Sequence, residues 1–490
     1  MITILDAVRD PKLFHPWFRK RATWENWLIF LAALFALPMS AEQFKIYEQC
    51  TGRTAPLSQP ATEGWLVCGR RAGKSFILAL IAVFIACFHD FRSSLAPGER
   101  GTILIVAVDR RQARVILRYI SALLTGVPML ARMIEREAAE AFDLSNSITI
   151  EVGTASFRTI RGYTIVAALL DELAFFRTDD AADPDFEILD AIRPGMATIP
   201  GAMLLCASSP YARRGALWTA HRKHFGKDGD PVLVWQADTR TMNPTVPQRV
   251  IDEATERDPA SAAAEYGARF RSDVESFVNR EAVETCVSLG VRERQPMSAV
   301  SYSAFVDPSG GSGDSMTLAI GHQEDDVAVL DAIRERRPPF SPEDVVLEFA
   351  ELLKTYRITE VQGDRYSGEW TRERFNHHGI RYELAEKRKS DLYRDFLPAI
   401  NSRMVDLLDD ARLFAQIVGL ERRTARGGND SIDHAPGAHD DLANSVAGVV
   451  AALASSAHGY DTSMKWVGGA EPGRLSLWQH PYFNNGRSRW

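Results

Sequence analysis

Leu66-Val-Cys-Gly-Arg-Arg-Ala-Gly-Lys-Ser75 is the stretch that decides the fold of the first part of this chain. A short apolar run predicted as a strand precedes it, and a long apolar run predicted as a helix follows it. The backbone N–H groups of residues 69–73 can wrap an anion, and the N-terminus of the helix adds positive potential. The stretch therefore predicts a phosphate-binding loop between a buried strand and a helix.

Two side chains at the end of this loop have the chemistry that a nucleotide requires. Lys74 is expected to reach the β- and γ-phosphates, and the Ser75 hydroxyl is expected to ligate Mg²⁺. The usual pattern is GxxxxGK[ST], and Cys68 stands at its first glycine. A plain glycine-rich turn is the alternative. The predicted nucleotide contacts of the loop are Gly69, Arg70, Arg71, Gly73, Lys74 and Ser75.

An acidic pair, Asp171-Glu172, follows a second apolar run over residues 165–170. A buried strand of this kind can deliver Asp171 to Mg²⁺ and Glu172 to the attacking water, which it would polarise. Acid pairs after apolar strands also arise by chance, so this pair indicates a nucleotide site only in combination with the phosphate-binding loop. Together the two motifs predict ATP hydrolysis rather than passive nucleotide binding.

Three further features fit this prediction. Ser208 and Ser209 end the next predicted strand, where their hydroxyls can sense the γ-phosphate and couple hydrolysis to motion. Gln43 lies upstream of the loop, where its amide can read the edge of adenine, although a lone glutamine is normally a surface residue. Arg70 can stabilise charge on the transferring phosphoryl group, and an ion pair elsewhere in the domain is its alternative.

Short β-rich runs alternate with helical stretches from about residue 65 to residue 209, which predicts a mostly parallel sheet covered on both faces. The predicted strands are Gly64–Cys68, Gly101–Val108, Ser147–Val152, Ile165–Leu170 and Ala202–Ala207, and the predicted helices are Lys74–His89 and Arg110–Leu124. Ahead of them, Thr23 is expected to cap a helix that ends near Pro38.

A second pattern begins after a charged stretch around residues 270–298. It predicts a mixed α/β sheet of hairpin-connected strands with a helix, another strand and a late helix. These elements are expected at Val300–Asp307, Met316–Gly321, Val327–Ile333, Glu343–Tyr356, Glu360–Gly363 and Asp440–Ala454.

Acidic residues mark three places in this second pattern. Asp307 and Asp364 each end a strand, and Asp440 and Asp441 start the late helix. This is how RNase H-like nucleases gather two Mg²⁺ or Mn²⁺ ions, which prefer oxygen ligands and clamp a phosphodiester between them. Single acids of this kind also occur in turns and helix caps. The spacing leaves open whether Asp440 or Asp441 is the main ligand. Asp314 and Glu360 are nearby acids that are not expected to bind the metals.

The predicted organisation follows from these two patterns. It consists of an N-terminal helical segment over 1–40, a P-loop (RecA/ASCE-like) ATPase domain over 41–280, a linker over 281–298, an RNase H-like nuclease domain over 299–455 and a C-terminal tail over 456–490.

The composition is that of an ordinary globular protein, with 46% hydrophobic and 25% charged residues. The net charge of −7 means that binding to DNA must come from local basic patches, for which a solvated surface is the alternative. Five scattered cysteines without CxxC spacing argue against a disulfide framework or a zinc site. The longest apolar run, Trp27 to Leu37, is too short for a membrane span, so a soluble intracellular protein is expected. The basic patches are Arg19-Lys20-Arg21, Arg334 to Arg337, Lys387-Arg388-Lys389, and Arg422-Arg423 with Arg426.

The order of these motifs resembles that of the large subunits of phage and prophage terminases, over roughly residues 20–455. The residues that carry the resemblance are Gln43, Gly69 to Ser75, Asp171, Glu172, Ser208, Ser209, Asp307, Asp364 and His439 to Asp441. The resemblance implies that Lys74 and Ser75 bind ATP and Mg²⁺, that Asp171 holds the metal and that Glu172 is the catalytic carboxylate. It also implies that Arg70 is the loop arginine of the family, and that Asp307, Asp364 and Asp441, with Asp440 close by, are nuclease metal ligands.

Partners are implied only by this resemblance. They are double-stranded DNA, the portal protein of a procapsid, a small terminase subunit and further copies of the chain in a ring, all in the cytoplasm of a host bacterium. Two other classes of function remain open. One is a helicase or repair ATPase with an attached nuclease, for which only the ambiguous Arg213-Arg214 is present. The other is a non-catalytic scaffold that binds DNA or a portal.

Overall fold

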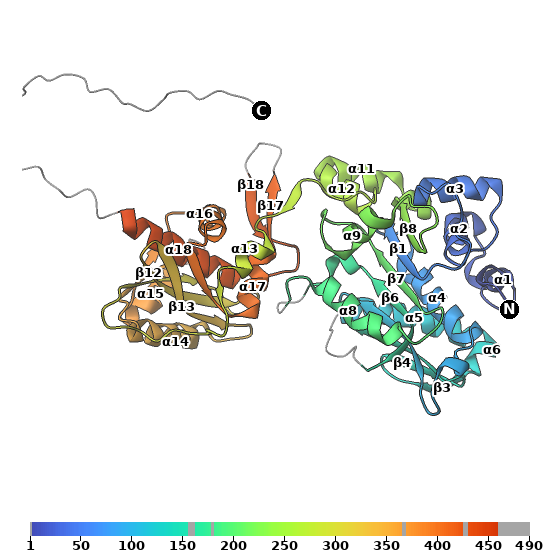
Figure 1. Ribbon diagram of the computed structural model, residues 1–490, viewed down its shortest axis with the longest axis horizontal. Helices are drawn as coiled ribbons and strands as arrows, with labels where there is room; N and C mark the ends of the chain where they lie inside the picture. The colour runs from blue at the N-terminus through green and yellow to red at the C-terminus, as the bar shows by residue number, and fades with distance from the viewer. Residues whose placement is uncertain (1, 155–161, 178–180, 365–368, 425–429, 459–490) are drawn as a thin grey trace, which may run out of the picture.

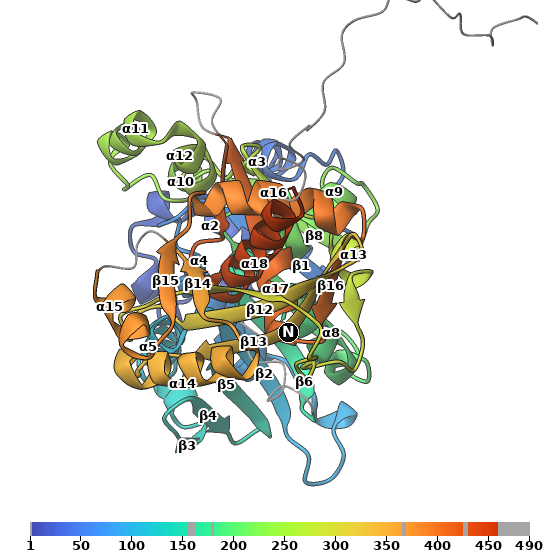
Figure 2. The same ribbon diagram turned by 90° about the vertical axis from the view of Figure 1, so that its left-hand side faces the viewer.

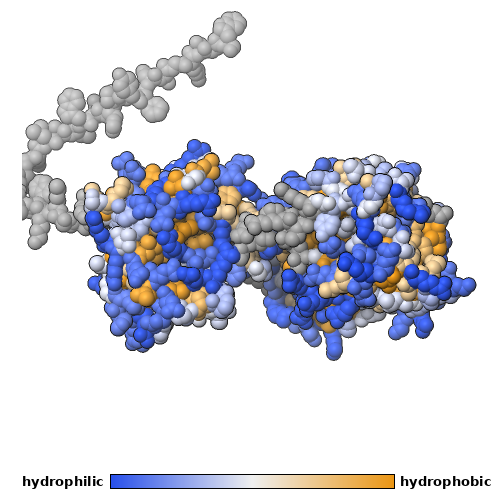
Figure 3. All heavy atoms as spheres, turned by 90° about the horizontal axis from the view of Figure 1, so that it is seen from below, coloured by the Kyte–Doolittle hydropathy of each residue, from blue (hydrophilic) through white to orange (hydrophobic). Residues whose placement is uncertain are grey.

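The computed structural model describes residues 2–154, 162–177, 181–364, 369–424 and 430–458. These residues form two bodies, each built around its own sheet (Figure 1). The predicted tail lies outside the described residues beyond residue 458. The face of the molecule seen in Figure 3 is mostly hydrophilic, with apolar residues in scattered groups. None of the helices in the described ranges has the length and apolar content that a bilayer crossing needs.

The first sheet has eight strands in the order β3-β4-β5-β2-β6-β7-β1-β8. The six strands from β5 to β8 in this order run parallel, and β4 and β3 are added antiparallel at one edge. The bounds are β1 Glu63–Cys68, β2 Gly101–Ala107, β3 Ile134–Glu137, β4 Ala141–Leu144, β5 Ile148–Thr154, β6 Thr164–Asp171, β7 Met203–Ser208 and β8 Val232–Ala237.

Helices cover both faces of this sheet, as its alternating side chains require. In β1, Leu66 and Cys68 join one apolar cluster, whereas Trp65 and Val67 join another on the opposite face. The first face is covered by α1 Ile4–Arg9, α2 Glu25–Leu34, α3 Ala41–Thr51, α4 Lys74–Phe88, α5 Arg110–Thr125 and α6 Pro128–Ala131. The second face is covered by α8 Pro184–Met196 and α9 Gly215–His224.

All five strands and both helices predicted for the first sheet are present, within two residues of the predicted bounds. Strands β3, β4 and β8 were not predicted. The prediction that Thr23 caps the first long helix is wrong: α2 begins after Trp24, which makes no side-chain cap, and the Thr23 hydroxyl donates to the carbonyl of Lys20. The apolar run at Trp27 forms most of α2, and its side chains from Trp27 to Leu34 are buried. Its side chains share one apolar cluster with α4 and β1.

The second sheet has seven strands in the order β10-β16-β13-β12-β11-β14-β15. Its central part is an antiparallel meander, β11 to β13, followed by β14 and β15 parallel to β11, which is the RNase H-like arrangement. The bounds are β10 Val287–Ser288, β11 Tyr302–Asp307, β12 Met316–Glu324, β13 Val327–Arg336, β14 Glu360–Gly363, β15 Arg381–Leu384 and β16 Val405–Leu408.

Two groups of helices pack on opposite faces of the second sheet, seen in Figure 2 with α18 and α14 on either side of β12 and β13. One group is α13 Arg280–Glu284, α16 Lys389–Asn401, α17 Ala411–Val418 and α18 Asp441–His458, and the other is α14 Pro342–Thr355 and α15 Glu369–His377. The stretch predicted as a linker, 281–298, contains most of α13 and the strand β10, which pairs with β16. Much of it therefore belongs to the second body.

A small three-stranded sheet joins the two bodies (Figure 1). Strand β9, Val274–Ser276, leaves the first body by way of α10 Thr239–Met242, α11 Gln248–Arg257 and α12 Pro259–Glu265. It pairs antiparallel with β17, Leu420–Thr424, which forms a hairpin with β18, Asp430–His434. Glu421 of this hairpin is fully buried, and its carboxylate accepts hydrogen bonds from Tyr211 and Arg214 of the first body.

Candidate nucleotide and metal sites

The phosphate-binding loop joins β1 to α4 as the sequence predicts. Gly73 has a φ of +107° and directly precedes Lys74, the first residue of α4. Arg71 has a φ of +62°, a left-handed conformation that is uncommon for a residue with a side chain. The loop is held from outside, because Trp27 donates to the carbonyl of Ala72 and Asn243 donates to the carbonyl of Arg71. The strained backbone is therefore fixed by the surrounding structure.

The register of the sheet brings the acidic pair and the serine pair to this loop. Strand β7 lies between β1 and β6, with Val67 opposite Ser208 and Asp171 opposite Ala207. All three strands are parallel, so their carboxyl ends meet at one edge, where ligands bind in sheets of this kind. The loop, the acids and the serines are thus neighbours in space although they are far apart in the sequence.

Four polar side chains form the centre of this site. The Ser75 hydroxyl donates to Asp171 Oδ2 over 2.7 Å, and Lys74 Nζ lies 3.1 Å from Glu172 Oε1. Lys74, which is almost completely buried, also donates to the carbonyls of Cys68 and Gly69. Sequence reasoning missed Gln112, whose amide donates to Asp171 Oδ2 over 3.0 Å. The position of Gln112 in the first turn of α5, directly after β2, could have indicated it.

Asp171 is fully buried, and the site around it suits a divalent cation. Burial raises the pKa of Asp171 to about 6, with a further contribution from the Glu172 carboxylate. Oδ1 of Asp171 is buried without a hydrogen-bond partner among the described residues. A carboxylate oxygen in this state next to a serine hydroxyl is the donor set that Mg²⁺ prefers.

Glu172 connects the loop lysine to the serine pair. It has a φ of +58°, and its Oε2 accepts hydrogen bonds from Ser208 Oγ, Ser209 N and Ser209 Oγ at 3.0–3.3 Å. Its other oxygen faces Lys74. Both serines are buried, so they have little contact with water. Any change in the position of Glu172 therefore acts directly on the end of β7.

Two predicted nucleotide contacts are engaged elsewhere. The exposed Arg70 side chain makes an ion pair with Glu265, with Nη1 3.1 Å from Oε1, which is the alternative that the sequence left open. The Gln43 side chain closes a capping box with Ser40 at the start of α3 and also lies within 3.4 Å of Glu25. Roles for Arg70 in phosphoryl transfer and for Gln43 in adenine reading stay predictions.

The second site gathers Asp307, Asp364 and Asp441 at one edge of the second sheet. Asp307 ends β11, and Asp364 follows β14, whose Gly363 pairs with Val306 of β11. Asp441 is the first residue of α18. The Thr317 hydroxyl in β12 donates to the Asp441 carbonyl, and the Ser315 N–H donates to its Oδ2. Strand β12 thus fixes the start of α18 against the ends of β11 and β14.

Asn444, which sequence reasoning missed, connects two of these acids. Its Nδ2 lies 2.8 Å from Asp307 Oδ2 and 3.4 Å from Asp364 Oδ2. It is fully buried and stands three residues after Asp441, so the helical repeat places it on the same side of α18. That spacing was the available signal. Its Oδ1 has no hydrogen-bond partner in the part of the chain that the structure describes.

The carboxyl groups of this site perturb one another. Burial raises the pKa of Asp307 well above its usual range, and the charges of Asp441 and Asp364 raise it further. Burial and the neighbouring Asp440 raise the pKa of Asp441 to about 6. Divalent cations relieve such crowding of negative charge and prefer carboxylate and amide oxygens. The residues present therefore fit the Mg²⁺ or Mn²⁺ ions that the sequence predicts.

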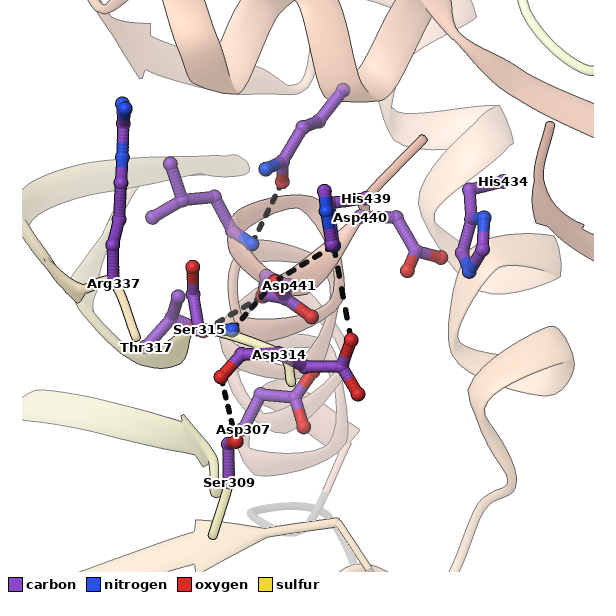
Figure 4. A network of polar contacts seen from close by, with 12 residues as sticks. Asp307, Ser309, Asp314, Ser315, Thr317, Arg337, His434, His439, Asp440 and Asp441 are labelled. Atoms are coloured by element: carbon purple, nitrogen blue, oxygen red, sulfur yellow. Dashed lines mark hydrogen bonds and ion pairs between the residues drawn. The ribbon is translucent and has the colours of Figure 1, made fainter. Parts of the chain in front are cut away.

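Asp440 and Asp441 point in different directions. Figure 4 shows Asp441 above Asp307, whereas Asp440 is turned toward His434. Both oxygens of Asp440 are engaged, one by Lys389 and the other by the Tyr393 hydroxyl. The exposed Asp314 lies near Asp441, with its Oδ1 3.8 Å from His439 Nδ1. Glu360, the other acid not expected to bind the metals, lies at the far end of β14 from Asp364.

The topology and the two sites define the class of this protein: a P-loop sheet with an acidic pair, joined to an RNase H-like sheet with a carboxylate cluster. No protein-family model matches the sequence, and no curated protein matches it.

Similar solved structures are large terminases. The crystal structure of the HK97 bacteriophage large terminase is 17% identical, covers 85% of this chain and 95% of its own, and has a TM-score of 0.38. The large terminase of the thermophilic bacteriophage D6E is 12% identical over 85% of this chain and 99% of its own, with a TM-score of 0.36. The large terminase nuclease of the thermophilic phage G20c is 16% identical over 36% of this chain and 97% of its own, with a TM-score of 0.32.

Proposed function

We propose that this chain is a terminase large subunit: an ATP-hydrolysing motor that moves double-stranded viral DNA into a procapsid and cuts concatemeric DNA. One observation carries the proposal. A phosphate loop in contact with its acidic pair and a cluster of three carboxylates occur in one chain, at the strand ends of two successive sheets. The motif order that resembles the terminase family is therefore matched by side chains that meet in space.

In the first site, Lys74 would bind the phosphates of ATP, and Ser75 with Asp171 would hold Mg²⁺. Glu172 is a carboxyl side chain beside Lys74 that can orient and polarise a water molecule. It also holds Ser208 and Ser209 through three hydrogen bonds. A shift of Glu172 during hydrolysis would be transmitted to these serines and to the chain that follows β7.

In the second site, Asp307, Asp364 and Asp441 would hold two Mg²⁺ or Mn²⁺ ions, which supply Lewis-acid stabilisation of the attacking and leaving oxygens of a phosphodiester. Asn444 keeps Asp307 and Asp364 at a fixed separation by donating to both. The portal protein, a small terminase subunit and a ring of identical chains are the partners proposed with this function. A host bacterial cytoplasm is the proposed location.

Glu172→Gln tests the motor. The variant keeps the shape of the side chain but loses its charge, so it should bind ATP normally and hydrolyse it ~10²–10⁴-fold more slowly. Turnover is measured by phosphate release from the full chain with and without DNA, and binding by calorimetry with a non-hydrolysable ATP analogue. Unchanged turnover would remove Glu172 from the mechanism and would favour a site that binds nucleotide without using this acid.

Asp307→Ala tests the nuclease in the same full-length protein. It should abolish Mn²⁺-dependent cutting of plasmid DNA while ATP hydrolysis continues. Glu360→Gln is the matched control, because Glu360 is a half-exposed acid at the opposite end of β14 from Asp364. Cutting that persists in Asp307→Ala would contradict the nuclease site. Absence of cutting in every protein, with ATP hydrolysis intact, would favour a DNA-translocating ATPase of the helicase type or a binding scaffold.

A further inference from the structure

Lys389 is the first residue of α16 and belongs to a short basic run. The run is Lys387-Arg388-Lys389. Lys387 precedes α16, is exposed and pairs with Asp395 of that helix, with its Nζ 2.6 Å from Asp395 Oδ2. Lys389 instead lies beside Asp440, which directly precedes the cluster residue Asp441. The two lysines of the run therefore have different environments, and Lys389 pairs with Asp433 of β18 and with Asp440, the residue before α18.

The ammonium group of Lys389 is held in place from two sides. Its Nζ lies 2.8 Å from Asp440 Oδ1 and 3.3 Å from Asp433 Oδ1. The other oxygen of Asp440 accepts a hydrogen bond of 2.8 Å from Tyr393, which is fully buried and one turn further along α16. Asp440 itself is almost completely buried. Tyr393 thus fixes Asp440, and Asp440 fixes the lysine.

The Lys389 side chain is 31% exposed and that of Asp433 is 43% exposed, so this ion pair contributes little to folding, whereas the pair with Asp440 compensates the charge of a buried carboxylate. A lysine that is both restrained and reachable from solvent is suited to binding a ligand of negative charge.

The neighbouring carboxyl groups would repel a negatively charged substrate, and a lysine can offset this repulsion. Asp307, Asp364 and Asp441 bring three carboxyl groups together, and the proposed substrate is a polyanion. DNA affinity comes largely from basic side chains that neutralise phosphates. The chain as a whole has a net charge of −7 and offers no general attraction. A fixed cation beside the carboxylates is therefore where a phosphate could be held next to the reacting bond.

We propose that Lys389 binds a phosphate of the DNA strand being cut, and that Asp440 is a positioning residue which holds Lys389 rather than a ligand of the nuclease metals. The proposal rests on the nuclease function proposed above. Under this proposal the two adjacent acids have different roles, because Asp441 faces the cluster with Asp307 and Asp440 faces the lysine.

A metal ion is the competing occupant of the position beside Asp440. Asp433, His434 and Asp440 place three ligand atoms within 4.8 Å of one another. Lys389 already donates to two of these three residues, so its ammonium charge would repel a divalent cation bound to them. The Mn²⁺ measurement described below tests whether such a cation binds there.

The experiment measures the binding of a short DNA duplex to the full-length protein over a range of salt concentrations, with Ca²⁺ in place of Mn²⁺ and the duplex checked afterwards for cutting. Lys389→Met should weaken binding and reduce the slope of log K against log salt by about 1, the loss of one phosphate contact. Lys389→Arg should keep the slope. Lys354→Met is the matched control, because Lys354 is an exposed lysine of α14 on the opposite face of the same sheet.

Mn²⁺ calorimetry without DNA separates this role from a structural one. Lys389→Met and Asp440→Asn should both keep the Mn²⁺ affinity of the wild type, while Lys389→Met cuts DNA on the order of 10²-fold more slowly. An unchanged salt slope in Lys389→Met would overturn the phosphate contact, and lost Mn²⁺ affinity in Asp440→Asn would make Asp440 a ligand. If the wild type binds DNA but never cuts it, the nuclease proposal fails, and the salt slope still decides whether Lys389 contacts a phosphate.

Discussion

Replacing Asp171 by asparagine should change how the stability of the first domain depends on pH. Asp171 is fully buried, and burial together with the Glu172 carboxylate raises its pKa from 3.8 to about 6. A carboxyl group whose pKa is higher in the folded chain than in the unfolded chain opposes folding once it is ionised. The shift of about 2 pKa units corresponds to ~3 kcal/mol above pH 6, and this cost is lost as the pH falls through 6 toward 3.8.

Asparagine carries no charge, so the variant lacks this pH-dependent cost. Its single oxygen can still accept from Ser75 and Gln112, which both donate to Oδ2 of the native carboxylate. Its amide nitrogen would replace Oδ1, which has no partner among the described residues, and adds a cost of ~1–3 kcal/mol at every pH. When the pH is raised from 5 to 8, the free energy of unfolding of the variant should therefore increase relative to that of the wild type by roughly half of the ~3 kcal/mol.

The assay is urea unfolding of both full-length proteins at pH 5 and pH 8, in EDTA so that no divalent cation binds Asp171. The buried Trp27 and Trp235 of the first domain provide the fluorescence signal. Comparing the two proteins at each pH removes the titration of all other groups. A stability difference that is the same at both values, or that favours the variant more at pH 5, would refute the assignment of a raised pKa to Asp171.

Two predictions concern the second domain. Gly448→Ala would place a Cβ 2.2–2.6 Å from three ring carbons of the buried Phe305. This overpacking should destabilise the domain by ~1–3 kcal/mol and lower its melting temperature in calorimetry, while ATP hydrolysis continues. An unchanged melting profile would show that α18 can move away from β11. Asn444→Ala removes the donor shared by Asp307 and Asp364 and should weaken Mn²⁺ binding ~10–100-fold in calorimetry; unchanged affinity would mean that the strands alone fix both acids.

The strands that precede the functional residues were predictable because each has a recognisable local sequence pattern. The strand before the phosphate loop and the strand before Asp171 are continuous apolar runs, as expected of strands buried on both faces. The different directions of the Asp440 and Asp441 side chains were not predictable. It depends on where α18 begins and on Tyr393 and Lys389, which approach from α16.

The elements that were missed depend on partners distant in the sequence. Strand β3 is mostly exposed, and β10 consists of two residues that form a strand only by pairing with β16. The engagement of Arg70 by Glu265 is likewise a contact across almost two hundred positions of the sequence. Local patterns indicate what a segment can form, whereas such contacts are set by the assembled fold.

The sheet of β9, β17 and β18 determines how this protein can be divided for expression. A nuclease fragment begun near residue 295 would lack β9, α13 and β10, which leaves the edge of β17 unpaired and removes Val283 and Cys286 from the apolar core. An open strand edge invites aggregation. A fragment begun just before Val274 keeps the third strand but exposes the buried Glu421, which the first domain covers through Tyr211. In such a fragment Glu421 keeps the ion pair with Arg423 of its own strand but loses the hydrogen bonds from Tyr211 and Arg214, so the face of the hairpin that the first domain covers becomes exposed to solvent.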